Sequence, residues 1–362
     1  MIEAQSIQEK QSSPILIGVC ATLLVLAISA LIIAGFTQVF GLPFFLEWVG
    51  TFLLCATPFQ VMMAVVWHHR VPSKIAEMSQ PLKGVILTSM VLLAGSIITP
   101  ILYFTVGQGV MSPILIHFAI QSVGVSLLVI LIFGGWPINK LTDNPLWQGI
   151  AILIYCYLLN YVLFKLFYDY SFFSGLPFYS PELEPGGMFN GISALSFAVT
   201  VVAMVMVATM FELWPITKMG KDINQPLMGL LSTGLIVCVS GVVYYIFVGL
   251  LKMEPMDFMV KGPVCIIFGT FLVENMMQFQ LFSQCVQPLK GLLKVVLCLI
   301  GAFVMYHLYS YALPFFAGTD LVPGPEMGYA REAWIGTATL GVTFPVINII
   351  AGAFELWPVK RN

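Results

Sequence analysis

The sequence predicts an all-α polytopic membrane bundle of ten transmembrane helices, built from five tandem helical hairpins of the same orientation. Composition gives the first reason: 59% of the 362 residues are hydrophobic, only 9% are charged, and the mean hydropathy is +0.96. A soluble domain has about a quarter of its residues charged. The second reason is the presence of ten apolar stretches long enough to cross a bilayer. The third is a set of short motifs that recur at the ends of these stretches.

The apolar stretches define the expected helices. They lie at residues 14–36, 47–67, 82–105, 112–134, 146–167, 190–214, 226–250, 260–282, 289–312 and 334–356. Residues 1–13 form a polar tail, and residues 14–362 form a single transmembrane domain. The first stretch lacks a small-residue cleavage site, so we interpret it as a retained helix and not as a signal peptide.

Lysine and arginine predict the orientation. If the N-terminus is cytoplasmic, the segments on that side carry eleven basic residues and those on the opposite side carry four. The eleven are Lys10, Arg70, Lys74, Lys83, Lys140, Lys218, Lys221, Lys290, Lys294, Lys360 and Arg361. Cytoplasmic loops carry the excess of positive charge, so we expect both termini to be cytoplasmic and the protein to lie in the plasma (inner) membrane.

Two families of motif indicate an internal repeat. FELWP ends two stretches, at 211–215 and 354–358, and FGGWP at 133–137 is a weaker copy. QPLKG begins two others, at 80–84 and 287–291, with QPLMG at 225–229 and NPL at 144–146. Because the motifs agree on the phase, we predict hairpins at about 14–71, 80–137, 144–215, 225–283 and 287–358. All units share one orientation, so the inverted repeats of many transporters are not visible.

The motifs have an ordinary structural interpretation. Proline fits the first turn of a helix, and tryptophan anchors a helix at the membrane boundary. QPLxG then starts a helix and FELWP stops one. The alternative is that Glu212 and Glu355 pair with cations at the cytoplasmic mouth of a transport path.

Glu274 is the most unusual residue within the apolar stretches. A carboxylate at that depth is costly unless it is paired or protonated, so it must face protein or water. It marks a candidate cation or proton site; the alternative is a neutral acid that hydrogen-bonds helices together. The residues proposed for a substrate or ion path are Glu274, Asn275, Gln278, Asn160, Asn348 and Gln121, and Gln60 adds another amide.

His117 and His307 are expected at similar depth in the outer half of the membrane. A haem or metal held between them is a weak candidate, and packing hydrogen bonds are the alternative. The sequence itself requires no cofactor.

Two outer segments, 168–190 and 311–333, are long and rich in aromatic residues, proline and glycine. They could dock other membrane or extracytoplasmic subunits, or lie among lipid headgroups. A net charge of −2 gives no reason to expect a nucleic-acid partner.

No P-loop, GxGxxG, HExxH or GxSxG motif is present, so no enzyme class is favoured. The first functional hypothesis is a transporter or channel for a small solute or ion, with its path near Glu274. The second is a non-catalytic membrane subunit or scaffold, and the third is a membrane enzyme or haem protein based on the two histidines.

Overall fold

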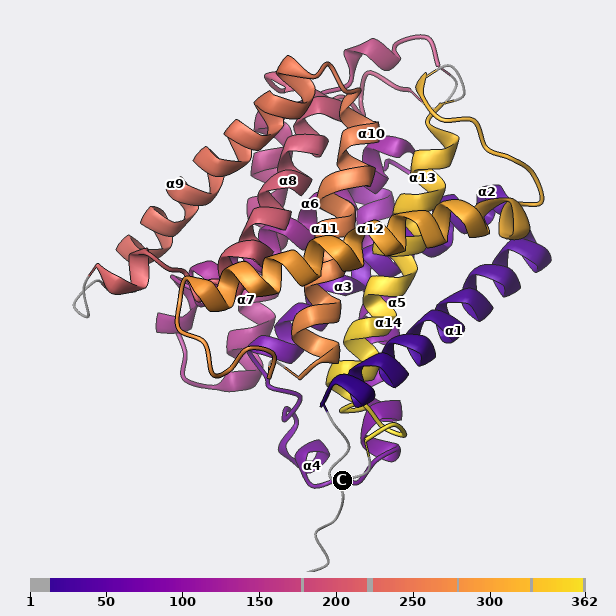
Figure 1. Cartoon of the computed structure of the whole chain (residues 1–362). Coiled ribbons are helices and arrows are strands. Elements are labelled where there is room, and N and C mark those ends of the chain that lie inside the picture. Colours follow the sequence, from indigo (N-terminus) through magenta and orange to yellow (C-terminus); the bar gives the residue numbers. More distant parts are fainter. Residues whose placement is uncertain (1–13, 177–178, 220–223, 279, 326–327, 361–362) are drawn as a thin grey trace, which may run out of the picture.

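The computed structural model describes residues 14–176, 179–219, 224–278, 280–325 and 328–360, so the predicted tail 1–13 lies outside the described residues. Within this part of the chain, ten helices are long and apolar enough to cross a membrane. The chain is therefore a multi-pass integral membrane protein with an all-α body (Figure 1). We call the side on which residues 14 and 360 lie the terminal side, and the opposite side, which carries residues 168–190, the loop side.

The five odd-numbered spans lie on the outside. In the most apolar 18-residue stretch of each, only 11–28% of the residues are buried. They are α1 (Pro14–Phe40), α5 (Leu82–Thr105), α7 (Pro145–Phe167), α9 (Gln225–Tyr244) with its π-helical end Tyr245–Leu250, and α12 (Leu289–Ala317).

The five even-numbered spans lie inside, and 56–67% of the corresponding stretch is buried. They are α2 (Leu42–Phe44) with α3 (Gly50–Val65), α6 (Pro113–Leu127), α8 (Gly191–Met210), α10 (Pro255–Met259) with α11 (Cys265–Phe271), and α13 (Ala330–Gly336) with α14 (Phe344–Asn348). Four of these inner spans contain π-helical segments, at Phe45–Val49, Leu128–Ile132, Val260–Val264, Leu272–Met276, Thr337–Thr343 and Ile349–Ala353. Such segments leave backbone groups without regular partners and are frequent at functional sites.

The inner spans form a closed ring. α3 packs on α6, α6 on α8, and α8 on α10 and α11; α11 then packs on α14, which returns to α3. The described connections between spans contain only short elements: α4 (Ser73–Ala76), 3-10 turns at Ile138–Lys140, Ser171–Phe173 and Ile216–Lys218, and a parallel pair of β1 (Tyr168–Asp169) with β2 (Phe189–Asn190).

Each outer span slants across the ring and does not lie along its predicted hairpin partner. α12, for example, begins beside the end of α8, crosses α11 and reaches α13 only at its loop-side end (Figure 1). α5 packs on α3, α7 on α6, and α9 on α8, so these outer helices pack most extensively on the inner helix that precedes them. The predicted hairpins are therefore not the units in which the helices pack.

Glycines at the starts of the outer spans explain this slant. Each one lies directly against a large side chain at the end of an inner span, so a methyl group added there would overlap that side chain. The pairs are Gly18 with Met277, Gly84 with Phe354, Gly149 with Trp67, Gly229 with Phe133, and Gly291 with Phe211. Small residues let helices approach closely in membranes, and here they fix where each outer helix crosses the ring.

In two places the QPLKG and FELWP motifs bind each other, an arrangement we call a clasp. In the first clasp, Gln80 donates to the Ala353 carbonyl at 2.9 Å and Lys83 pairs with Glu355. The second clasp repeats these contacts, with Gln287 donating to the Met210 carbonyl at 3.0 Å. Its ion pair joins Lys290 to Glu212 at 2.6 Å, and the hydrogen bond from Lys290 holds the pKa of Glu212 below its usual range. The two motifs are thus complementary halves of one contact.

Replacing Gly291 with alanine is expected to lower the free energy of unfolding by about 1–3 kcal/mol, because the added methyl group overlaps Phe211. Gly234 on α9 has no neighbour within 4 Å of an added Cβ, so Gly234→Ala is the matched control and should cause no loss. The measurement is reversible unfolding in mixed micelles. Equal effects of the two substitutions would contradict close packing at Gly291.

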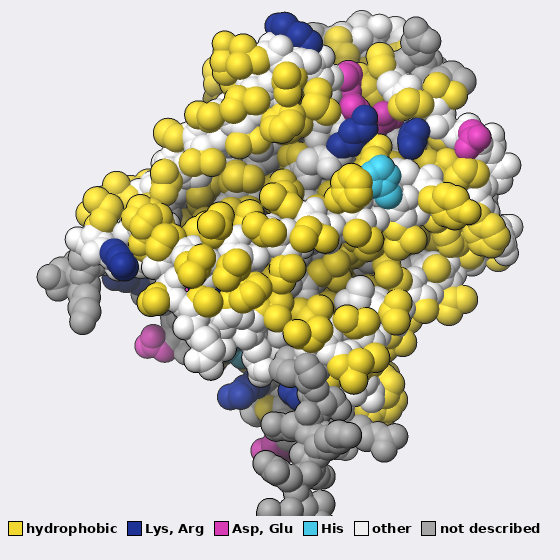
Figure 2. Space-filling model, viewed as in Figure 1, with side chains coloured by type: hydrophobic (Ala, Val, Ile, Leu, Met, Phe, Trp, Pro, Cys, Tyr) yellow, Lys and Arg dark blue, Asp and Glu magenta, His cyan; other side chains and the backbone are white. Residues whose placement is uncertain are grey.

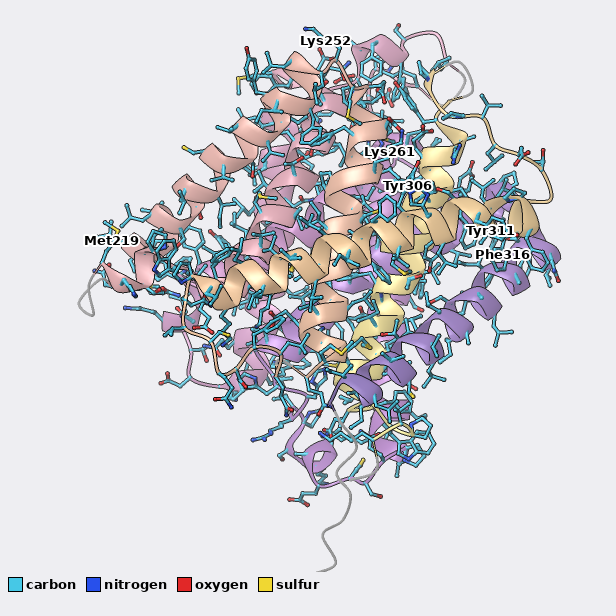
Figure 3. All side chains as sticks on the ribbon, in the orientation of Figure 1. Met219, Lys252, Lys261, Tyr306, Tyr311 and Phe316 are labelled. Carbon is cyan, nitrogen blue, oxygen red and sulfur yellow. The ribbon has the colours of Figure 1, made fainter. Side chains whose placement is uncertain are left out.

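The surface is apolar around the middle of the molecule. Figure 2 shows hydrophobic side chains covering most of one face, with charged side chains gathered in a few places towards its upper and lower parts. Tyr311 on α12 is 88% exposed and Met219 is 71% exposed, and both point outwards in Figure 3. This belt is typical of a surface that faces lipid.

One predicted span is displaced along the chain. The eighth was expected at 260–282, but the structure places it at Pro255–Met276. Its first turns carry Asp257 and Lys261, which neutralise each other as an i,i+4 ion pair at 2.7 Å. Composition alone therefore placed the helix start after Asp257, although the predicted span already contained Lys261.

Candidate functional site

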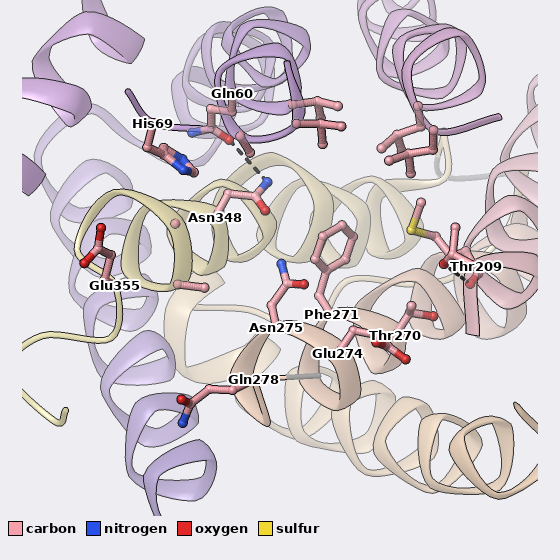
Figure 4. A pocket seen from close by; sticks show the side chains of 18 of the residues that line it. Gln60, His69, Thr209, Thr270, Phe271, Glu274, Asn275, Gln278, Asn348 and Glu355 are labelled. Atoms are coloured by element: carbon pink, nitrogen blue, oxygen red, sulfur yellow. Dashed lines mark hydrogen bonds between the residues drawn. The ribbon is translucent and has the colours of Figure 1, made fainter. Parts of the chain in front are cut away.

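A polar cavity opens on the terminal side of the inner ring. Its volume is about 550 Å³, and all five inner spans or the segments that follow them line it. Polar and charged lining residues are Gln60, His69, Thr209, Thr270, Glu274, Asn275, Gln278, Asn348, Glu355 and Lys360. Four of the six residues predicted for a path, Glu274, Asn275, Gln278 and Asn348, therefore line one cavity (Figure 4).

Amide side chains form the polar wall of this cavity. Asn348 lies just before a π-helical segment and donates to Gln60 at 3.4 Å. Asn275 lies within the π-helical segment Leu272–Met276, and its side chain points towards Asn348 across the cavity (Figure 4). Amides both donate and accept hydrogen bonds, so this wall can replace part of the hydration shell of a polar solute or an ion.

Glu274 is not alone, because Lys294 of α12 pairs with it. Lys294 Nζ lies 2.7 Å from Glu274 Oε1, and the two side chains are 5% and 10% exposed. Lys294 is one of the eleven predicted cytoplasmic charges, although the predicted span 289–312 contains it; in the structure its side chain is buried within Leu289–Ala317. Removing two charges from water is costly, and their mutual attraction offsets that cost only in good geometry.

A second group of charges surrounds the mouth of the cavity. Lys360 donates to Gln278 at 2.9 Å, and Glu355 pairs with Lys83 of the first clasp. Burial and the nearby Lys83 lower the pKa of His69 to about 4, so this ring is neutral at physiological pH. The clasp therefore holds one wall of the mouth in place.

Asn160 and Gln121 do not line this cavity. Asn160 is fully buried on α7 and donates to the Phe118 carbonyl at 3.1 Å, which is a packing contact between α7 and α6. Gln121 of α6 lines a separate pocket on the outer side of the ring. Amides at similar depth cannot be told apart in a sequence. Whether each one faces the cavity depends on the rotation of its helix about the helix axis.

A second cavity of about 410 Å³ lies on the loop side of the ring. His117 lines it, and its Nδ1 lies 2.8 Å from the hydroxyl of Tyr170. His307 is exposed on α12 beside Phe303, with the ring centroids 4.3 Å apart, and lines neither cavity. The two histidines thus face different surroundings. Among the described residues, no group of three or more His, Cys, Asp or Glu side chains is placed to hold a metal ion.

Between the two cavities the ring narrows to an apolar constriction. The void there is about 20 Å³, and hydrophobic side chains together with Gly124 line it. Each inner span contributes, through Leu54, Leu127, Val199, Ile267 and Phe344. Leu127 also lines the terminal-side cavity, whereas Leu54, Ile120 and Leu340 also line the loop-side cavity. The three voids therefore follow one another through the ring.

The loop 168–190 folds over the loop-side cavity. Tyr170 is fully buried, and its backbone N–H donates to both carboxylate oxygens of Glu184 at 3.0 Å. Phe173 and Leu176 line the cavity. We expect these side chains to dock a partner or to lie among lipid headgroups; Phe173 is partly buried, whereas Phe172 and Leu176 are each 44% exposed.

Comparisons with protein families, with curated proteins and with solved structures found no match to this chain.

Proposed function

We propose that the chain is a membrane transporter or channel for a small polar solute or ion, and that the route runs along the axis of the inner ring. The observation that carries the proposal is the succession of a polar cavity, an apolar constriction and a second cavity, all lined by the same five spans. Hydrophobic constrictions between wet cavities gate pores by excluding water.

Charge and polarity support a polar cargo. The terminal-side cavity combines amides with Glu274, whose buried partner Lys294 lies on α12, and ionisable residues inside a membrane commonly belong to substrate or proton pathways. The described π-helical segments Leu272–Met276 and Ile349–Ala353 border this cavity, which places irregular backbone where it can bind a solute.

The alternative of a non-catalytic subunit or scaffold receives less support. It rests on the odd number of repeats, the shared orientation of the units and the aromatic outer loops, of which Phe173 and Leu176 line the loop-side cavity. A scaffold has no need of connected voids through its centre.

Flux measurements in proteoliposomes test the proposal with a panel of labelled monovalent cations, anions and small neutral solutes. At least one solute should cross faster than in protein-free vesicles. Asn275→Leu should lower its flux by about ten-fold, an effect of roughly 1.4 kcal/mol on the barrier, because it removes an amide from the cavity wall. Gln121→Leu, which changes an intramembrane amide outside the cavity, is the control and should leave flux unchanged. Flux that is insensitive to Asn275→Leu would refute this route.

A further inference from the structure

The loop-side cavity is lined by a single acidic side chain and no basic one. Of the described residues around its volume of about 410 Å³, Glu332 is the one Asp, Glu, Lys or Arg, and most of the others are apolar or aromatic. Glu332 lies on α13 and is 4% exposed. A carboxylate buried within a membrane span is costly unless another group compensates its charge.

The compensation of Glu332 within the protein is incomplete. Among the described residues it forms no ion pair, and its carboxylate accepts the backbone N–H of Gly324 at 3.2 and 3.4 Å. Lys261 and Arg331 share with Glu332 a separate void of about 50 Å³, but Lys261 pairs with Asp257 at 2.7 Å. The negative charge of Glu332 therefore has no directly bound cation, and the loop-side cavity lies beside it.

Aromatic rings form another part of the wall. Phe172 and Phe173 of the loop line the cavity, with their ring centroids 4.3 Å apart, and Tyr329 lines it next to α13. The hydroxyl of Tyr329 donates to Glu254 at 3.0 Å, which fixes the position of its ring. The faces of such rings attract cations, and aromatic walls commonly recognise alkylammonium ions.

This lining selects among classes of ligand. A metal ion such as Ca²⁺ requires several oxygen ligands, and the cavity offers one carboxylate; among the described residues no group of three or more His, Cys, Asp or Glu could hold a metal. An anion would be repelled by Glu332, and an uncharged apolar molecule would leave the carboxylate uncompensated. An organic cation satisfies both the charge and the apolar wall. Sites for small molecules commonly occupy 300–1,000 Å³, so the cavity is large enough for one.

We propose that the loop-side cavity binds a small monovalent organic cation, an ammonium ion with an aliphatic or aromatic part, and that this is the class of solute that the route carries. The ammonium group lies beside Glu332, and the rings of Phe173 and Tyr329 contact the rest of the ion. The assignment as a transported solute rests on the proposed function, whereas binding is tested without measuring flux.

Equilibrium binding to the purified full-length chain in mild detergent tests the site. The probe is tritiated benzyltrimethylammonium, which is charged at every pH. We expect saturable binding that excess tetraethylammonium displaces and that phenylacetate, an anion of similar size, leaves unchanged. Potassium ions should also fail to displace the probe, because they cannot replace its contacts with the apolar wall. The absence of saturable binding, or equal displacement by all three ions, would overturn the proposal.

A filling variant tests the location of the probe. Gly336 lines the loop-side cavity and has no neighbour within 4 Å of an added Cβ, so the side chain of Gly336→Leu can extend into the cavity without displacing other groups. It should weaken binding by about ten-fold or more, because it occupies the space of the ligand. Gly241 on α9 is equally open at Cβ and lines none of the cavities described above. Gly241→Leu is therefore the matched control and should leave binding unchanged.

Charge and aromatic contacts are tested separately. Glu332→Gln keeps the size of the side chain and an acceptor for Gly324 but removes the charge, and it should weaken binding by about ten-fold or more. Glu182 is an exposed acid on the same side, so Glu182→Gln should change affinity by less than about two-fold, as expected for a screened charge. Phe173→Leu should weaken binding about two- to five-fold through the loss of a cation–π contact.

Gel filtration and circular dichroism check the folding of each variant, and Gly336→Leu still tests the site if Glu332→Gln misfolds. Binding that survives both substitutions contradicts the site, and binding that only Gly336→Leu weakens contradicts recognition of charge. The outcome for transport is distinct. A chain that binds the probe but carries no solute in proteoliposomes keeps the site and loses the proposed function, whereas flux of another solute without binding of the probe keeps the route and refutes this solute class.

Discussion

Replacing Lys294 with methionine is expected to lower the free energy of unfolding by about 3–5 kcal/mol, the usual cost of leaving one partner of a buried ion pair alone. The cause is Glu274, which remains buried in the inner ring after it loses the 2.7 Å contact. Unfolding in mixed micelles, followed by circular dichroism during titration with a denaturing detergent, measures this change.

The second clasp provides a matched control one helical turn away. Lys290 pairs with Glu212, but that carboxylate side chain is 58% exposed, against 10% for Glu274. Lys290→Met should therefore cost only about 0–1 kcal/mol, as exposed ion pairs do. Similar losses for Lys290→Met and Lys294→Met would contradict the importance of burial at Glu274.

A double variant separates stability from function. Glu274→Gln with Lys294→Met removes both charges, so most of the lost stability should return, and the resulting cycle measures the coupling between the two residues. If this neutral variant folds and keeps its full flux, Glu274 serves only to pack helices. If it folds and loses flux, the pair takes part in transport.

Hydropathy was sufficient to locate the ten spans, because a bilayer requires long apolar runs whatever their function. The third span was predicted at 82–105 and found at Leu82–Thr105. The ninth was expected to end at 312 but continues to Ala317, beyond Pro314, since the outer helix crosses the ring at a slant and must be longer. The slant of a helix depends on the helices that pack against it, and a hydropathy profile holds no information on that packing.

The sequences of the two clasp motifs indicate that they pair. Only two outer spans begin with QPLKG, and only two inner spans end with FELWP. Lysine occurs in one motif as often as glutamate occurs in the other, and the structure pairs Lys83 with Glu355 and Lys290 with Glu212. The equal numbers pointed to pairing, but the choice of partner required the order of helices around the ring.

Lys294 is the residue beside the candidate site that the sequence identifies least clearly. It lies three residues after Gly291, where the other four glycine-containing helix starts have Ala21, Leu87, Ile152 and Ser232. A single charge at a position otherwise free of charge indicates burial with a partner, the same argument that singled out Glu274. Because Lys294 lies near the start of its helix, we expected it on the cytoplasmic side. Whether neighbouring spans cover the first turns of that helix depends on how the helices pack, which the sequence does not show.

Replacing Leu127 with asparagine should open the constriction to water and raise ionic leak across the membrane by about ten-fold or more, in keeping with gating by dewetting. Leu127 lines both the constriction and the terminal-side cavity and is 3% exposed. The present void of about 20 Å³ has room for roughly one water molecule but offers it no polar partner, so it stays dry. An amide there supplies both a donor and an acceptor, which favours a continuous file of water between the two cavities.

Val205→Asn is the control for this experiment. Val205 is 1% exposed on α8 and lines the pocket on the outer side of the ring that Gln121 also lines, so the same amide is introduced into an inner helix outside the constriction. Currents in planar bilayers should rise for Leu127→Asn and stay at the wild-type level for Val205→Asn. If both variants leak equally, the amide has loosened the bundle in general; if neither leaks, no aqueous route passes Leu127. Only a leak confined to Leu127→Asn places the conduction path on the axis of the inner ring.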